Sequence, residues 1–227
     1  MSYNIAIDGP AGAGKSTIAR AAARKMNLIY VDTGAMYRAM ALFMVREGID
    51  LQDTEAIIRK CREADITIRY EEGVQVVLLN GENVNAYLRT EEVGHAASVV
   101  SVIPRVREKL VELQKRLAAE SDCIMDGRDI GTCVLPHADR KIYLTASSAV
   151  RAKRRYDELA AKGESCELKK IQEDIEERDY RDMHREASPL RQAEDAVLVD
   201  TSDMTVEEVI DRILSICERQ AGERESV

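Results

Sequence analysis

The amino-acid sequence predicts an α/β fold in which helices cover both faces of a mostly parallel five-stranded sheet. Short apolar segments with strand character alternate with helical segments along the 227 residues, and this alternation is typical of parallel sheets. One glycine-rich turn separates the first strand from the first helix. Ligands bind such sheets at the carboxyl ends of the strands, so this turn is a candidate site.

The predicted elements follow one another in a regular order. Strands are expected at residues 5–7, 28–31, 123–125, 141–144 and 196–200. Helices are expected at residues 18–25, 33–47, 54–64, 91–120 (interrupted near Pro104), 148–161, 167–185 and 205–219. Asp32 or Thr33 can cap the second of these helices, and Ser147 or Ser148 the fifth. The last residues, 221–227, are expected to fray.

Residues 65–88 have the pattern of antiparallel strands. Apolar and polar residues alternate over 66–70, and an apolar strand follows at 74–79. Asn80-Gly81 is a strong hairpin signal, and a third short strand is expected around Val84. We therefore predict a small antiparallel insert within a single domain that spans the whole chain.

The glycine-rich turn fits the phosphate-loop pattern G-x-x-x-x-G-K-[ST]. Its glycines let backbone N–H groups curl around phosphate oxygens, and the next helix directs its positive end at the same anion. Lys15 is expected at the outer phosphates of a nucleotide and Ser16 at Mg²⁺. The residues expected to bind phosphates are Gly9, Pro10, Ala11, Gly12, Ala13, Gly14, Lys15, Ser16 and Thr17.

Composition argues against several classes of protein. The net charge of −8 disfavours a binder of polymeric nucleic acid, because phosphate backbones need a basic face. No apolar run reaches membrane-spanning length, and no signal segment is recognised. The five cysteines are odd in number and form no C-x-x-C motif. We expect a cytoplasmic protein with free thiols.

Arginines occur at positions that a phosphoryl group could bring together. Arg38 and Arg128 each follow a predicted strand, and Arg178, Arg181 and Arg185 share one face of a predicted helix. The plain alternative for that helix is a solvated face with an Arg178–Asp182 pair. Because a phosphate loop lies in the same chain, we favour guanidinium groups that stabilise a moving phosphoryl group.

Two further charged positions have open interpretations. Asp126, at the end of a strand, either holds Mg²⁺ through water or caps a turn. Arg151, Arg154 and Arg155 belong either to a mobile lid that closes over the nucleotide or to an exposed basic helix face. The lid interpretation covers about residues 151–168.

Five segments resemble bacterial cytidylate kinase, in the same order along the chain. They are residues 7–17, 32–38, 104–107, 126–132 and 177–182. Asp-Thr-Gly-Ala-Met-Tyr-Arg at 32–38 and Asp-Gly-Arg-Asp-Ile-Gly-Thr at 126–132 are much more specific than the phosphate loop. The resemblance runs from residue 4 to about residue 201. It implies a three-layer P-loop kinase core, a nucleoside-monophosphate-binding insert at about residues 62–100 and a short helical lid.

The resemblance also implies a reaction and its residues. The γ-phosphoryl group of ATP, with Mg²⁺, would pass to CMP or dCMP, giving ADP and CDP or dCDP. The implied catalytic residues are Lys15, Arg38, Arg128, Arg178 and Arg185. The residues implied at CMP are Thr33, Arg38, Ser98, Arg107, Arg128, Asp129, Arg178, Asp182 and Arg185, with Ser98, Arg107 and Asp129 at the cytosine edge and Asp182 at the sugar hydroxyl. Arg151 and Arg155 are assigned to ATP, and Asp126 to Mg²⁺ through water.

Three alternatives stay open at this point. The acceptor could be UMP, AMP or shikimate, the protein could be a nucleotide-dependent switch or ATPase, or it could be a non-catalytic nucleotide-binding module. No water-positioning Gln is recognisable, and the intact Lys15, Ser16 and arginine set speak against a degenerate module. We expect small-molecule nucleotides as partners, neither polymeric nucleic acid nor membrane, and a monomer.

Overall fold

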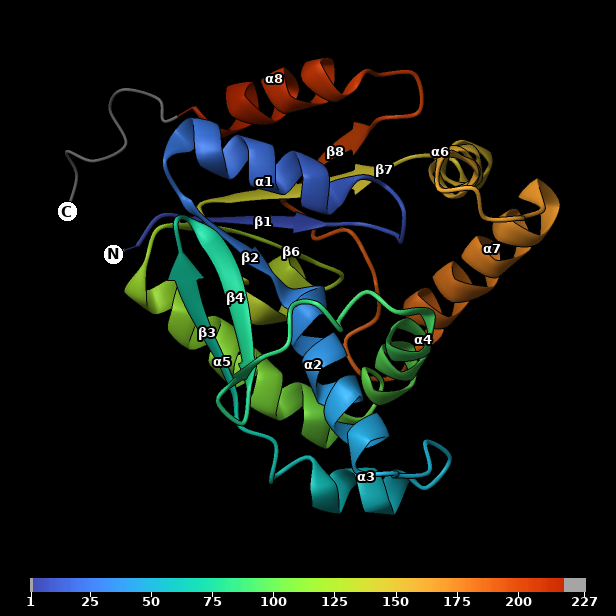
Figure 1. Ribbon diagram of the computed structural model, residues 1–227. Helices are drawn as coiled ribbons and strands as arrows, with labels where there is room; N and C mark the ends of the chain where they lie inside the picture. The colour runs from blue at the N-terminus through green and yellow to red at the C-terminus, as the bar shows by residue number, and fades with distance from the viewer. Residues whose placement is uncertain (1, 219–227) are drawn as a thin grey trace.

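The computed structural model describes residues 2–218, and a five-stranded parallel sheet lies at its centre (Figure 1). The strand order is β2-β6-β1-β7-β8. The strands are β1 (Asn4–Asp8), β2 (Ile29–Asp32), β6 (Cys123–Gly127), β7 (Arg140–Thr145) and β8 (Val197–Asp200). All five run in the same direction, so their carboxyl ends meet at one edge. The predicted fold class is confirmed.

Helices cover both faces of this sheet, as Figure 1 shows. One face carries α1 (Lys15–Met26) and α8 (Val206–Cys217), and the other carries α2 (Thr33–Arg46) and α5 (Pro104–Glu120). Strand side chains alternate between the two faces. Thus Ile5 and Ile7 of β1 pack with α1 and α8, whereas Ala6 between them packs with α2 and α5. The apolar strands are therefore buried on both sides, as parallel strands require.

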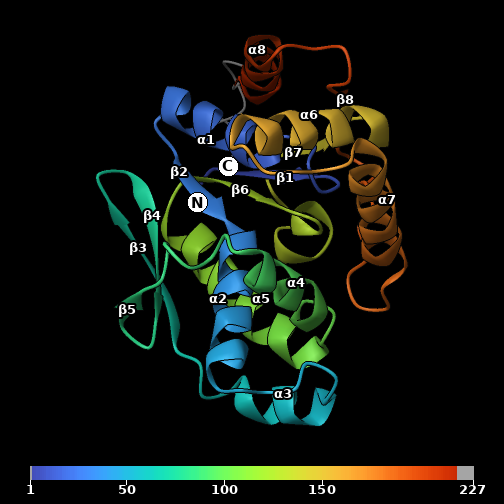
Figure 2. The same cartoon turned by 45° about the vertical axis from the view of Figure 1, so that its right-hand side comes forward.

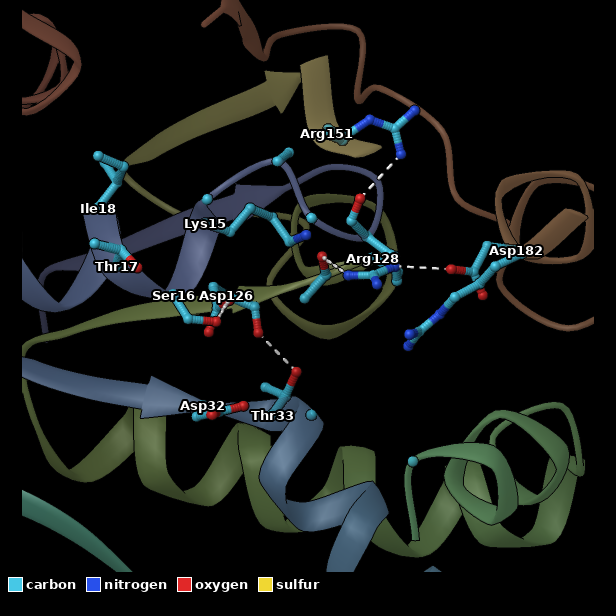
Figure 3. A pocket seen from close by; sticks show the side chains of 18 of the residues that line it. Lys15, Ser16, Thr17, Ile18, Asp32, Thr33, Asp126, Arg128, Arg151 and Asp182 are labelled. Carbon is cyan, nitrogen blue, oxygen red and sulfur yellow. Dashed lines mark hydrogen bonds and ion pairs between the residues drawn. The ribbon is translucent and has the colours of Figure 1, made fainter. Parts of the chain in front are cut away.

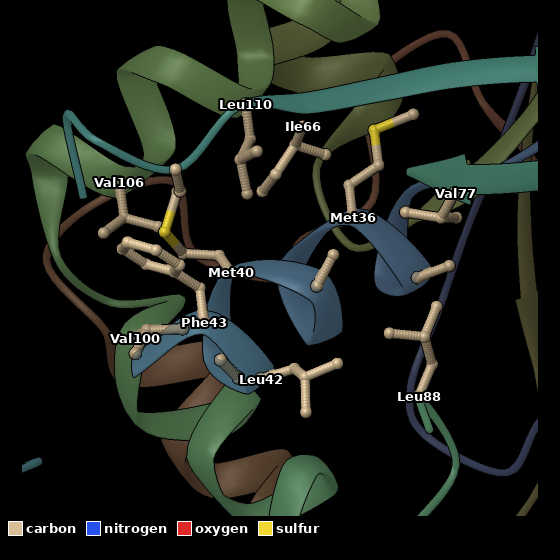
Figure 4. Packing of buried hydrophobic residues seen from close by; sticks show 14 of the residues in the cluster. Met36, Met40, Leu42, Phe43, Ile66, Val77, Leu88, Val100, Val106 and Leu110 are labelled. Atoms are coloured by element: carbon tan, nitrogen blue, oxygen red, sulfur yellow. The ribbon is translucent and has the colours of Figure 1, made fainter. Parts of the chain in front are cut away.

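The larger core is built around α2 (Figure 4). Met36, Met40 and Phe43 of this helix are buried, and they pack among side chains of α5, of the insert and of α4 (Glu91–Val100). The unbranched methionines fill irregular gaps between these elements. Burial on nearly every side fixes the position of α2, whose first turn begins at the carboxyl edge of the sheet.

The insert is a separate antiparallel sheet at the side of the core (Figure 2). It comprises β3 (Ile66–Glu71), β4 (Val74–Leu79) and β5 (Glu82–Asn83), so the predicted hairpin is confirmed and its third strand ends just before Val84. The amide of Gln75 accepts from Asp32 N at 2.8 Å and donates to Asp32 O at 3.2 Å. Because β2 is an edge strand, this side chain stands in for a strand partner at the end of β2.

The remaining helices lie around the carboxyl edge and below α2. They are α3 (Thr54–Lys60), α6 (Ser148–Ala161), α7 (Leu168–His184) and a π-helical turn, η1 (Ile130–Val134). The helices α6 and α7 pack against each other beyond the carboxyl ends of the strands (Figures 1 and 2). None of the helices within residues 2–218 is both long and apolar enough to cross a membrane.

Several local predictions need correction. The helix expected at 54–64 ends at Lys60, and α7 ends one residue before Arg185. The turn η1 was not predicted. The helical spacing of Val106, Leu110, Leu113 and Leu117 predicts an apolar inner face for α5. That face also buries Arg107 and Gln114. Residue 219 and the tail predicted to fray at 221–227 lie outside the described residues.

We predict that Gly9 supports the junction between β1 and the phosphate loop. Its φ is +149°, and a Cβ there would lie 1.9 Å from the backbone oxygen of Leu144 on β7. Gly14 is a matched control, because its φ is +85° but a Cβ would meet open space. Gly9→Ala should lower the free energy of unfolding by about 2 kcal/mol more than Gly14→Ala, measured by urea denaturation. Equal losses in the two variants would contradict this prediction.

Candidate active site

A cavity of about 720 Å³ opens at the carboxyl edge of the sheet (Figure 3). It is lined by the phosphate loop, by the starts of α1 and α2, by the segment after β6, and by α4, α6 and α7. Ten cationic side chains and five carboxylates line it, in a chain whose net charge is −8. The cavity therefore concentrates positive charge where the rest of the protein is acidic, which suits a phosphorylated ligand.

The phosphate loop has the expected geometry at one end of this cavity. Gly12 and Gly14 have φ of +76° and +85°, values that suit glycine, and Gly14 is the residue before α1. Lys15 Nζ donates to Pro10 O at 2.7 Å, and burial followed by the nearby Arg128 lowers the Lys15 pKa. Residues 11–17 line the cavity, whereas Gly9 and Pro10 are buried beside it.

Asp126 lies at the end of β6 and faces the start of α1. Its two oxygens accept from Ser16 Oγ at 2.9 Å and from the Tyr30 hydroxyl at 2.9 Å (Figure 3 shows the Ser16 bond). It caps no helix. Burial, reinforced by Asp32, raises the pKa of Asp126 to about 6, although Lys15 opposes the rise. A carboxylate and a hydroxyl side by side at a helix N-terminus are hard oxygen donors of the kind Mg²⁺ takes.

Asp32 rather than Thr33 caps α2. The Asp32 carboxylate accepts from Ala35 N at 2.9 Å and lies 4.0 Å from Arg38 and 3.6 Å from Arg89. The Thr33 hydroxyl instead donates to the backbone oxygen of Asp126 at 2.7 Å. Asp32 thus holds the helix start and keeps two arginines at the rim of the cavity.

Arg128 and Arg178 approach each other in the cavity from β6 and α7. Arg128 Nε donates to Asp182 at 2.9 Å, so Asp182 does not form the alternative pair with Arg178 (Figure 3). Arg178 Nε is buried and has no hydrogen-bond partner among the described residues. Burial, followed by the neighbouring Arg128, lowers the pKa of Arg178 to about 10. Two guanidinium groups therefore share a site with one carboxylate, which leaves positive charge for a ligand.

Asp129 lies at the far end of the cavity between two arginines. Its carboxylate pairs with Arg107 Nη2 and lies 3.5 Å from Arg185 Nη2. The Arg107 guanidinium also lies over the Tyr37 ring, 5.5 Å from its centroid, within the distance of a cation–π contact. Ser98 on α4 also lines the cavity. An ionised carboxylate accepts several hydrogen bonds, so Asp129 keeps acceptor capacity for a ligand.

The three arginines of the expected lid, Arg151, Arg154 and Arg155, occupy unlike environments. Arg151 is 5% exposed, and its guanidinium donates to Ala146 O at 2.8 Å, Ala11 O at 2.9 Å and Asp179 at 2.6 Å. It therefore connects the phosphate loop to α6 and α7, and the alternative of an exposed face is wrong for this residue. Arg154 donates to Thr201 O at 2.7 Å, and the half-exposed Arg155 pairs with Glu158.

The structure thus brings the predicted residues of the loop, strand ends and α7 to one cavity, apart from Gly9, Pro10 and Arg181. Arg181 instead lies 3.8 Å from Glu177 on the same helix. Sequence reasoning missed Arg89 and Tyr37 as lining residues. Arg89 stands alone in a loop, so no spacing marks it.

Comparison with known proteins places this geometry in a family context. The family model for cytidylate kinase matches residues 5–219. The cytidylate kinase of Desulfitobacterium hafniense is 49% identical over 215 residues, which cover 95% of this chain and 92% of that relative. The cytidylate kinase of Caldicellulosiruptor saccharolyticus is 48% identical over 219 residues, which cover 96% and 97%.

A solved structure also resembles the fold at low sequence identity. A crystal structure of an uncharacterised protein from Eubacterium ventriosum aligns with a TM-score of 0.51 and 12% identity, covering 96% of this chain and 100% of that chain. At this identity the likeness bears on the fold alone.

We predict that ionisation of the buried Asp126 carboxylate lowers the free energy of unfolding of the ligand-free protein above pH 6. Its pKa is about 6 in the folded state against 3.8 as the ordinary value, so the unfolded chain ionises first as the pH rises. In EDTA, the free energy of unfolding of Asp126→Asn minus that of the wild type should increase by about 2 kcal/mol from pH 4.5 to pH 8. A difference that stays constant over this range would contradict the prediction.

Proposed function

The chain belongs to the cytidylate kinase family, and from this premise we propose that it transfers the γ-phosphoryl group of ATP to CMP or dCMP. A phosphate oxygen of the acceptor attacks the γ-phosphorus, the bond from that phosphorus to the β,γ-bridging oxygen breaks, and ADP leaves with the electron pair. The products are ADP and CDP or dCDP. The observation that carries this proposal is the excess of guanidinium groups between the phosphate loop and Asp129.

The acceptor phosphate has a natural place among these guanidinium groups. Arg38, Arg128 and Arg178 all line the cavity, and no carboxylate of the described residues pairs with Arg178. Guanidinium groups bind phosphoryl oxygens through paired N–H donors and stay charged. We also assign Arg185, which contacts Asp129, to the acceptor phosphate. Thr33 is assigned to the edge of this phosphate site.

The base is read at the other end of the acceptor site. Cytosine presents an amine where uracil presents a carbonyl oxygen, and a carboxylate accepts a hydrogen bond only from the amine. Asp129 supplies that carboxylate, held by Arg107 and Arg185. Ser98 adds a hydroxyl nearby, and Asp182 is assigned to a sugar hydroxyl.

The donor site is the phosphate loop. Its backbone N–H groups and Lys15 bind the outer phosphates of ATP, and Lys15 exchanges its bond with Pro10 O for a phosphate oxygen. Ser16 and Asp126 fit Mg²⁺, because their oxygens adjoin at the N-terminus of α1. Ser16 would contact the ion directly and Asp126 through water. The ion would supply charge that offsets the outer phosphates.

The protein's own part in the reaction is positioning, charge stabilisation and exclusion of water. No general base is needed, since the acceptor is already a phosphate anion. Residues 62–100 form the acceptor-binding part, and residues 151–168 form a lid with Arg155 near ATP. The lid closes when both nucleotides are bound, because an open site would transfer phosphate to water. Arg151 serves the ATP site by holding Ala11 of the loop.

The competing functions have less support. Family membership favours a nucleoside monophosphate as the acceptor over shikimate, and the base site suits cytosine better than uracil or adenine. A switch or an ATPase would not need the arginines that we assign to the acceptor phosphate. We further propose that the enzyme is a monomer, since one chain supplies both halves of the site. We also propose that it acts in the cytoplasm, where its free cysteines stay reduced.

We predict selective turnover of CMP and dCMP in a coupled ADP-release assay with Mg·ATP and a panel of CMP, dCMP, UMP, AMP, GMP and shikimate. Asp129→Asn should lower the preference for CMP over UMP by at least about tenfold, because an amide can also donate to the uracil carbonyl. Asp139→Asn, which alters a carboxylate at the opposite edge of the sheet, is the control.

Equal kcat/KM for UMP and CMP in the wild type would refute the assignment of Asp129. ATP binding without turnover of any acceptor would instead favour a switch or a non-catalytic module.

A further inference from the structure

Asp8 is a buried carboxylate that the proposed reaction does not use. It is the last residue of β1, directly before Gly9 of the phosphate loop, and it is 5% exposed. It does not line the cavity, and it forms no ion pair within the described residues. A buried ionised group needs compensating hydrogen bonds to be tolerated, so its partners indicate its role.

Both partners of Asp8 lie in the segment that follows Asp129. Asp8 Oδ1 accepts from Ile130 N at 2.8 Å, and Oδ2 accepts from Gly131 N at 2.7 Å. These N–H groups open the π-helical turn η1, whose N-terminal flanking residue is Asp129 itself. The Asp8 carboxylate thus accepts from the first N–H groups of η1, as an N-cap side chain does at the start of a helix. Unlike an N-cap residue, Asp8 lies on a separate strand rather than next to the turn in sequence.

The turn η1 also holds the backbone of Asp129. The backbone oxygen of Asp129 accepts from Cys133 N at 2.9 Å and from Val134 N at 3.2 Å. Gly131 leaves little space, because a Cβ there would lie 3.4 Å from Asp8 Oδ2 and 3.2 Å from Lys141 Cδ. The backbone of Asp129 is therefore held by η1 after it, and η1 is held by Asp8.

Burial makes ionisation of the Asp8 carboxylate unfavourable. Burial raises the pKa of Asp8 to about 6, although the two backbone N–H groups oppose that rise. An asparagine would have the same shape without the charge, but it could accept only one of the two hydrogen bonds and would turn N–H groups toward the other. The two-acceptor geometry, rather than the volume, distinguishes aspartate at this position.

We propose that Asp8 is a positioning residue for acceptor recognition. From the end of β1, it holds the turn η1, which directs Asp129 toward the nucleobase of the acceptor nucleotide. This inference rests on the proposed function, in which Asp129 reads cytosine. It makes selectivity for the acceptor depend on the last residue of β1, directly before the phosphate loop, which does not line the cavity.

The test is the selectivity of Asp8→Asn, expressed as kcat/KM for CMP divided by kcat/KM for UMP. This ratio does not depend on the fraction of folded enzyme, because both substrates meet the same active molecules. We expect the ratio to fall about tenfold, with a raised KM for CMP and an unchanged KM for ATP. Asp139→Asn, whose carboxylate accepts from Asn4 N at the opposite end of β1, should leave the ratio unchanged.

A double variant separates positioning from general damage. If Asp8 acts through Asp129, adding Asp8→Asn to Asp129→Asn should lower the ratio no further. If Asp8→Asn gives no folded protein, Asp8→Glu keeps the carboxylate but displaces the N–H groups of Ile130 and Gly131, and the same fall in the ratio is expected. An unchanged ratio in the folded variant, or equal increases in KM for CMP and ATP, would overturn the proposal.

The outcome also distinguishes this proposal from the proposed function. If Asp8→Asn keeps the wild-type ratio of CMP to UMP and Asp129→Asn loses it, the role of Asp8 is overturned and the assignment of Asp129 to cytosine stands. If Asp129→Asn keeps the wild-type ratio, the assignment of Asp129 itself is overturned.

Discussion

The structure depends on keeping charged groups buried around a cavity without letting them neutralise one another. Arg178 illustrates the constraint, because its Nε is buried and unpartnered while Arg128 takes the nearby carboxylate of Asp182. Burial of a partly compensated charge destabilises a fold. The large apolar cores on both faces of the sheet offset this cost. In the proposed function, the anion that completes the site is the phosphate of the acceptor.

Carboxylates organise this excess of cations rather than cancel it. Asp32 starts α2 and keeps Arg38 and Arg89 at the rim, and Asp129 holds Arg107 and Arg185 at the far end. Each carboxylate sits at or just after the end of a strand, where the parallel sheet converges. The same edge therefore supplies both the carboxylates that position the arginines and the phosphate loop that we assign to the donor.

Much of this arrangement could be predicted from the sequence, because its signals are local. The strand–turn–helix at residues 5–17 and the charged residues after β2 and β6 placed most of the cavity. The buried roles of Arg151 and Asp8 could not be predicted, since each depends on contacts between distant segments. Arg151 bonds Ala11, 140 positions away, and Asp8 bonds Ile130, 122 positions away. Periodicity likewise predicts an apolar inner face for α5, but Asp129 draws Arg107 into that face.

Replacing Arg178 by methionine tests the central claim most directly. If the guanidinium serves a phosphate rather than the fold, Arg178→Met should leave the free energy of unfolding of the ligand-free protein equal or raise it by about 1 kcal/mol. In the same urea denaturation, the stabilisation that CMP gives the wild type should be largely lost, since that stabilisation reports binding to the folded state. A ligand-free variant that loses more than about 1 kcal/mol, with CMP stabilisation retained, would show that Arg178 is structural and would contradict the account.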